Sequence, residues 1–202
     1  KAADEFGAVI ALPDAMHKQG YDCWAFWQKP ARTGANDYAL LLNLVQTLLA
    51  QPDLQIDPAQ VYISGISSGG IFAMQTGCLA PEVFAGMGVY GAPSAGTPAH
   101  ATLRNTKTGS PETVAEFCLT QAGEHKDAFA TQMTSAASGE RDPLTNPTYA
   151  MQSAQGMALI YNVEQRPETR VIEEAKGADE IVWQNGRVSH LMIRTVGHDW
   201  PG

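Results

Sequence analysis

Residues 61–80 decide the fold, and they read VYISGISSGGIFAMQTGCLA. The apolar run Val61–Ser64 predicts a buried strand, and the composition of Gly69–Ala80 predicts a helix directly after it. Between them, Gly65–Gly69 matches the G-x-S-x-G pattern, in which a sharp strand-to-helix turn strains the central serine. We therefore predict that Ser67 is a nucleophile at the amino end of a helix, where N–H groups stabilise developing negative charge. The Ser68 amide is then the expected oxyanion donor.

The elements around this turn predict a parallel sheet. Ala8–Leu12, closed by Pro13, is a short apolar run typical of a buried strand. Asn36–Gln51 carries apolar residues at helical spacing, and Met87–Tyr90 predicts the next strand. Strands that alternate with helices favour an α/β fold, with a mostly parallel sheet and helices on both faces.

The second half of the chain continues the alternation. Met133–Ser138 predicts a strand, Pro147–Val163 a helix, and Ile181–Val196 a hairpin that turns at Asn185-Gly186. Residues 93–130 lack clean periodicity, so we expect loop and helix over the sheet edge, a candidate substrate lid.

A serine nucleophile needs an imidazole to take its proton and a carboxylate to orient that imidazole. In proteins with this G-x-S-x-G turn, the order along the chain is serine, acid, histidine. His198 comes last and lies in a loop directly after an expected strand. His198 is therefore the predicted general base. His190 lies inside that strand, where a structural histidine is the ordinary interpretation. The remaining histidines lie in polar stretches typical of solvent-exposed positions: His17, His100 and His125.

Two acidic residues compete for the orienting role. Asp142 follows the Met133–Ser138 strand, whose carboxyl end is where open α/β sheets place functional loops. Glu140 lies in the same turn, and the residues alone leave this choice open. Ser94 is a poor second nucleophile, because Pro93 and Pro98 prevent the helix that should follow it.

Composition limits the class of protein. The 202 residues, 44% of them hydrophobic, can bury a single core, so we expect one domain over residues 1–202. A net charge of -8 without a basic run argues against a nucleic-acid partner, and no apolar stretch is long enough for a membrane span. Cys23, Cys78 and Cys118 lack metal-ligand spacing, so no metal or cofactor is expected. They allow one disulfide and one leftover thiol, or three free thiols.

Six segments spread over most of the chain share the pattern of one family. They are Gly7–Asp14, Cys23-Trp24, Asp57–Tyr62, Gly65–Gly70, Pro81–Gly86 and Gly197–Gly202. Together they resemble esterases of the poly(3-hydroxybutyrate) depolymerase and feruloyl esterase type, which belong to the α/β-hydrolases. The family's acid follows a strand in a Gly-x-x-Asp turn, here Gly139–Asp142, so the resemblance favours Asp142 over Glu140.

The resemblance also implies parts that this sequence does not contain. In such enzymes a strand ending in His-Gly precedes the segment matched by Gly7–Asp14 and supplies the second oxyanion amide, and a helix follows the terminal histidine. The resemblance therefore implies a domain truncated at both ends. It places the partner of Cys23 in the missing stretch, which leaves Cys78 and Cys118 as the implied disulfide.

The predicted function is a serine esterase that works through an acyl-enzyme without a cofactor. The resemblance implies a secreted or periplasmic polyhydroxyalkanoate depolymerase acting on poly(3-hydroxybutyrate). The alternatives are a feruloyl or acetylxylan esterase, a peptidase of the same fold, and a catalytically silent binding module. Trp24, Trp27 and Trp200 could offer flat apolar area to a polymer or aromatic ester, with core packing as the alternative role.

Overall fold

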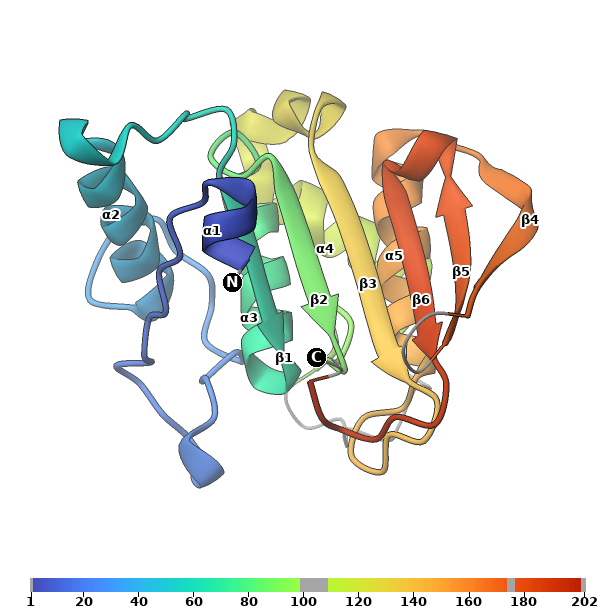
Figure 1. Cartoon of the computed structure of the whole chain (residues 1–202). Helices are drawn as coiled ribbons and strands as arrows, with labels where there is room; N and C mark the ends of the chain where they lie inside the picture. Colours follow the sequence, from blue (N-terminus) through green and yellow to red (C-terminus); the bar gives the residue numbers. More distant parts are fainter. Residues whose placement is uncertain (1, 99–108, 174–176, 201–202) are drawn as a thin grey trace.

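The computed structural model describes residues 2–98, 109–173 and 177–200, and its centre is one six-stranded sheet (Figure 1). In spatial order the strands are β1 (Tyr62–Ile66), β2 (Gly86–Tyr90), β3 (Met133–Gly139), β6 (Val188–Ile193), β5 (Ala178–Trp183) and β4 (Gln165–Ile172). The first four are parallel, whereas β5 runs antiparallel to β6 and to β4. The predicted mostly parallel sheet is confirmed.

The long helices that pack on the sheet lie on one of its faces, behind the strands in Figure 1. The helices are α1 (Ala2–Phe6), α2 (Asp37–Leu49), α3 (Ser67–Leu79), α4 (Pro111–Ala122) and α5 (Thr148–Tyr161). Helix α3 packs on β1 and β2, α5 packs on β3 and β6, and α4 contacts both of these helices. On the other face, Figure 1 shows the short α1 in front of the strands. Among the described residues, no helix is long and apolar enough to cross a membrane.

The main core lies between the sheet and these three helices. Fully buried side chains from α3, α4 and α5, such as Ile71, Val114 and Met157, meet Met87 and Val89 of β2 there. A disulfide between Cys78 and Cys118 joins α3 to α4, and Cys23 is a free thiol. One disulfide with one leftover thiol, in the pairing that the resemblance implied, is therefore confirmed. Because α3 begins at Ser67, the core fixes the helix that follows the proposed nucleophile.

Helix α4 is part of this core and covers no sheet edge. Its Val114 and Cys118 side chains are fully buried against the neighbouring helices. The expectation of a lid over residues 93–130 is therefore wrong for α4. Residues 99–108 lie outside the described part of the chain.

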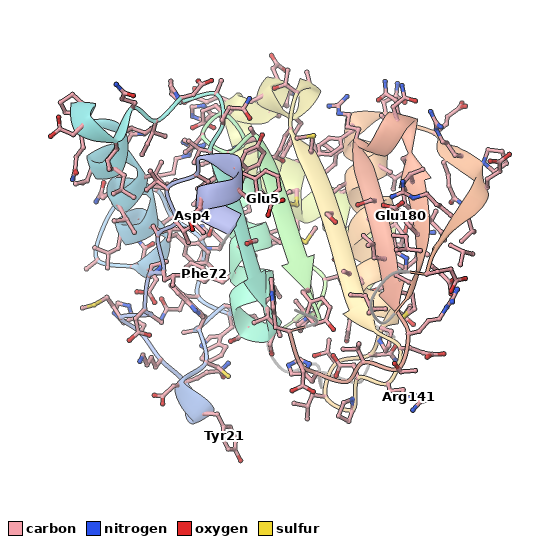
Figure 2. The ribbon with its side chains drawn as sticks, viewed as in Figure 1. Asp4, Glu5, Tyr21, Phe72, Arg141 and Glu180 are labelled. Atoms are coloured by element: carbon pink, nitrogen blue, oxygen red, sulfur yellow. A yellow bond between two sulfur atoms is a disulfide. The ribbon has the colours of Figure 1, made fainter. Side chains whose placement is uncertain are left out.

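A smaller aromatic cluster attaches α2 to α3. Asn36 caps α2 by accepting a hydrogen bond from the Ala39 N–H at 3.0 Å, which sets the start of this helix. Tyr38 stacks on Phe72 with ring centroids 4.2 Å apart, and Phe72 projects from α3 toward α2 (Figure 2). The Tyr38 hydroxyl donates to Gln75 Oε1 at 2.5 Å, and burial raises the pKa of Tyr38, so it stays a donor.

Three outcomes concern predicted strands. The hairpin is confirmed, with Asn185 and Gly186 at positive φ between β5 and β6. The strand expected at Ala8–Leu12 is wrong, because these residues form no strand and Leu12 is 91% exposed. An apolar run becomes a buried strand only when a neighbouring strand pairs with it, and none of the described strands does so. Strand β4 was missed because its residues are almost all exposed and include Pro167.

Candidate active site

The predicted turn around Ser67 is present between β1 and α3. Ser67 is the first residue of α3 and has φ 55°, in the left-handed region that costs a non-glycine residue about 1–2 kcal/mol. A Cβ at Gly65 would clash with the Gly69 carbonyl, and a Cβ at Gly70 would lie 2.8 Å from the Ala92 Cβ. These glycines let the strand and helix approach closely enough to hold the strained serine.

The amino end of α3 is suited to a developing negative charge. Its N-cap residue, Ile66, supplies no side-chain hydrogen bond to the first turn. The N–H groups of that turn point along a helix of 13 residues, whose dipole is positive at this end. The Ser68 amide lies in this turn, as an oxyanion donor should.

Asp142 and His198 meet at the carboxyl end of the sheet. His198 Nδ1 lies 2.7 Å from Asp142 Oδ2, and the two side chains are 15% and 0% exposed. Asp142 Oδ1 accepts hydrogen bonds from the N–H groups of Leu144 and Thr145, both at 2.8 Å. Figure 2 shows the neighbouring Arg141 at the end where the arrowheads of the parallel strands gather. A carboxylate held in this way can fix the tautomer and orientation of an imidazole.

Two glycines make room for this pair. Gly91 follows β2 with φ 52°, and a Cβ there would lie 3.2 Å from Asp142 Oδ2 and 3.5 Å from His198 Nδ1. A Cβ at Gly139, the last residue of β3, would clash with the Gly197 carbonyl in the His198 loop. Our sequence reasoning missed Gly91. The signal was a glycine directly at the carboxyl end of the predicted strand Met87–Tyr90.

Parallel strand order explains why Ser67 and the Asp142–His198 pair share one edge. Ile66 pairs with Tyr90, and Tyr90 pairs with Ala137, so these three strands end side by side. A hydrogen bond from Ser67 to His198 is not among the contacts of the described residues. Such nucleophile–base bonds are often long before substrate binds. The complete triad therefore stays a prediction.

The rival acid and nucleophile have other partners. Glu140 Oε2 accepts from the Thr195 N–H at 3.2 Å, in an exposed contact. Ser94 is fully buried, and its hydroxyl contacts Gln152 Oε1 at 3.2 Å. Neither contact involves Ser67 or His198.

The other histidines lie in different surroundings. His190 in β6 is 2% exposed, neither of its ring nitrogens has a partner among the described residues, and burial lowers its pKa to about 4. His17 Nδ1 lies 3.1 Å from Asp37 Oδ1, and His125 lies 3.6 Å from Glu82. His100 lies outside the described residues.

The three tryptophans occupy different positions. The backbone N–H of Trp24 donates to Ser68 Oγ at 3.2 Å, so this residue touches the turn that holds the proposed nucleophile. Trp200 is 59% exposed and packs edge-on against Tyr90, with centroids 5.8 Å apart. Trp27 is 45% exposed and contacts Phe26 at 5.4 Å.

Comparison with solved structures identifies the fold. The chain resembles the acetyl xylan esterase from Aspergillus awamori with a TM-score of 0.69 and 17% sequence identity, over 83% of this chain and 64% of that one. At this identity the likeness concerns the fold alone, and with the strand–serine–helix turn it defines an α/β-hydrolase fold.

Sequence comparison then identifies the family. Residues 1–114 match the model described as esterase PHB depolymerase, so the chain belongs to the esterase PHB depolymerase family. It is also 33% identical, over 205 aligned positions, to the poly(3-hydroxybutyrate) depolymerase of Ralstonia pickettii. That alignment covers 98% of this chain and 42% of the relative, so the chain spans less than half the length of that protein. The resemblance found in the sequence is confirmed.

Proposed function

We propose that this chain is a serine esterase that hydrolyses carboxylic esters through an acyl-enzyme. The observation that carries the proposal is the buried hydrogen bond between His198 and Asp142, at the same sheet edge as the strained Ser67. An imidazole that a carboxylate orients can take the proton of a serine hydroxyl, and this proton transfer activates the serine as a nucleophile. Family membership supports the same conclusion.

The chemistry follows from the roles of these groups. His198 takes the proton from the Ser67 hydroxyl as its oxygen attacks the ester carbonyl. The Ser68 amide donates a hydrogen bond to the oxyanion of the tetrahedral intermediate. His198 then gives the proton to the departing alcohol, and a water molecule repeats the sequence on the acyl-enzyme, which releases the acid.

The proposed substrate is poly(3-hydroxybutyrate) or its oligomers. The support comes from the relative of Ralstonia pickettii, whose name gives that polyester as its substrate. The exposed indoles of Trp27 and Trp200 offer apolar area that a polyester could contact. Feruloyl and acetylated xylan esters are the alternatives that the sequence resemblance left open.

We also propose that the protein works outside the cytoplasm, in the periplasm or the medium. The disulfide between Cys78 and Cys118 supports this location, because such bonds persist in oxidising compartments.

A fluorophosphonate probe tests the mechanism, because it labels only an activated serine. We expect labelling of the wild-type chain and none of Ser67→Ala, with Ser94→Ala as a matched serine control that is still labelled. The Ser67→Ala variant should keep its circular dichroism spectrum. Equal labelling of Ser67→Ala and the wild type would rule out Ser67 as the nucleophile.

Turnover of three ester classes tests the substrate. A 3-hydroxybutyrate oligomer, methyl ferulate and an acetylated xylan fragment should be compared at equal ester concentration. We expect the largest kcat/KM for the oligomer. A larger value for either of the others would assign the chain to the plant polysaccharide esterases.

A further inference from the structure

Trp24 touches the proposed active site from a segment far away in the sequence. We propose that Trp24 is a positioning residue that acts through the Ser68 hydroxyl, and that together they hold the first turn of α3 so that its amide meets the oxyanion. The inference rests on the proposed function and deepens it. It gives Trp24 a role different from the substrate contact that the sequence suggested.

The backbone of Trp24 is held on both sides. Its N–H donates to Ser68 Oγ at 3.2 Å, across 44 residues of sequence. Its carbonyl accepts from Gln19 Nε2 at 3.3 Å and from the Phe26 N–H at 3.0 Å. The donor that reaches Ser68 is therefore fixed by its own segment.

The Trp24 ring lies against the start of α3. Its centroid is 4.4 Å from that of Phe72, which is itself stacked on Tyr38. A Cβ built on Gly69 would lie 3.6 Å from both Cδ1 and Nε1 of the indole. The ring thus contacts the turn next to Ser68 as well as the side of the helix (Figure 2 labels Phe72 on that side).

The turn needs such support because it is strained. Ser67 has φ 55°, and a residue in this region stays there only when its surroundings determine its conformation. Strand β1 lies at the end of the strand order, with β2 on one side. The Trp24 segment supplies a contact to the turn that the sheet does not.

The contact leaves the oxyanion donor free. Trp24 binds the side chain of Ser68, so the Ser68 amide stays available to substrate. An oxyanion donor must lie about 2.7–3.1 Å from the charged oxygen, and a misplacement of about 1 Å can lower the rate by about 10²-fold. The contact from Trp24 fixes the residue that carries the oxyanion donor, and it therefore affects the stability of the transition state.

Ser68→Ala is the direct test, because it removes the acceptor and keeps the amide. Ser64→Ala, an exposed serine in β1, is the matched control. With a short p-nitrophenyl ester we expect Ser68→Ala to lower kcat about tenfold, a fraction of the loss when a whole donor is removed, at unchanged KM. Ser64→Ala should match the wild type, and both variants should keep the wild-type melting temperature.

A tetrahedral adduct separates positioning from a structural role. Phenylboronic acid forms such an adduct on an activated serine, so its inhibition constant should rise in Ser68→Ala by the same factor as kcat falls. A structural defect would instead lower the melting temperature and raise KM. That result, or a wild-type kcat in Ser68→Ala, would overturn the proposal.

Trp24 variants complete the test. Trp24→Ala keeps the backbone N–H but removes the ring that packs against Phe72 and Gly69, so it tests whether the ring holds this N–H in place. Trp24→Ala should reproduce the tenfold loss, and Trp24→Phe should recover most of the activity. Trp24→Ala with Ser68→Ala should lose no more than either alone, because without the ring the N–H no longer reaches Ser68. Multiplied losses in the double variant would refute the pairing. Fluorophosphonate labelling of the wild type distinguishes an error in this proposal from an error in the proposed function. A labelled wild type would keep the serine mechanism and reject only the role of Trp24, whereas an unlabelled wild type would reject the serine mechanism itself.

Discussion

At the scale of single residues, three hydrogen-bond contacts hold the Asp142 carboxylate in place. It contacts His198 and two backbone N–H groups within 2.8 Å, and its side chain is fully buried. In Asp142→Asn, the amide can stabilise the wrong imidazole tautomer, so we expect kcat to fall by up to about 10⁴-fold with the fold intact. Steady-state kinetics would check this. Glu140→Gln is the control, and if it lost activity while Asp142→Asn kept it, the acid would be misassigned.

Gly91 gives a second prediction at this scale. A Cβ at this position would lie 3.2 Å from Asp142 Oδ2, and φ 52° already disfavours a side chain there. Gly91→Ala should therefore displace the carboxylate or the ring and lower kcat by about 10-fold or more. It should also destabilise the protein by about 1 kcal/mol. Gly186→Ala, at φ 89° in open space, carries similar backbone strain far from the site and should keep full activity.

At the scale of elements, β6 contains a buried histidine, and we expect it to make stability depend on pH. Burial lowers the pKa of His190 to about 4, against 6.5 for the free side chain. The unfolded chain then binds the proton more tightly than the folded one, so the free energy of unfolding falls as pH drops from about 6.5 and the loss is complete below about 4. The shift corresponds to roughly 3 kcal/mol.

Urea unfolding between pH 7.5 and 4 would measure this dependence. His190→Gln, which cannot titrate, should show a shallower fall over the same range. The difference between the two curves isolates the histidine from the carboxylates, which also lose favourable contacts in acid. If the two curves were parallel, the buried imidazole would contribute nothing to acid sensitivity.

At the scale of the whole molecule, the disulfide ties together parts of the core that are 40 residues apart. Closing a loop of this length lowers the entropy of the unfolded chain, an effect of about 4 kcal/mol. The double variant Cys78→Ala with Cys118→Ala should unfold at a correspondingly lower urea concentration. It should retain esterase activity at low temperature, since Cys78 lies near the opposite end of α3 from Ser67. Activity lost before any unfolding would mean that the disulfide sets the geometry of the site.

The sequence by itself determined the local features. The turn at Gly65–Gly69 was visible because a strand, a strained serine and a helix follow one another within a few residues. The hairpin at Asn185-Gly186 was visible for the same reason, since turn chemistry depends on neighbouring residues. The family could also be inferred from the sequence, because each of its short segments can be recognised without knowing which residues it contacts in the fold.

The tertiary structure alone decided which distant groups meet. Asp142 and His198 are 56 residues apart, and spacing could not choose between Asp142 and Glu140 before β3 and β6 were placed side by side. The role proposed for Trp24 and the need for glycine at position 91 depend on contacts between elements, which leave no local pattern. The apolar run Ala8–Leu12 shows the converse, because its composition favours a strand but a strand forms only where another strand pairs with it.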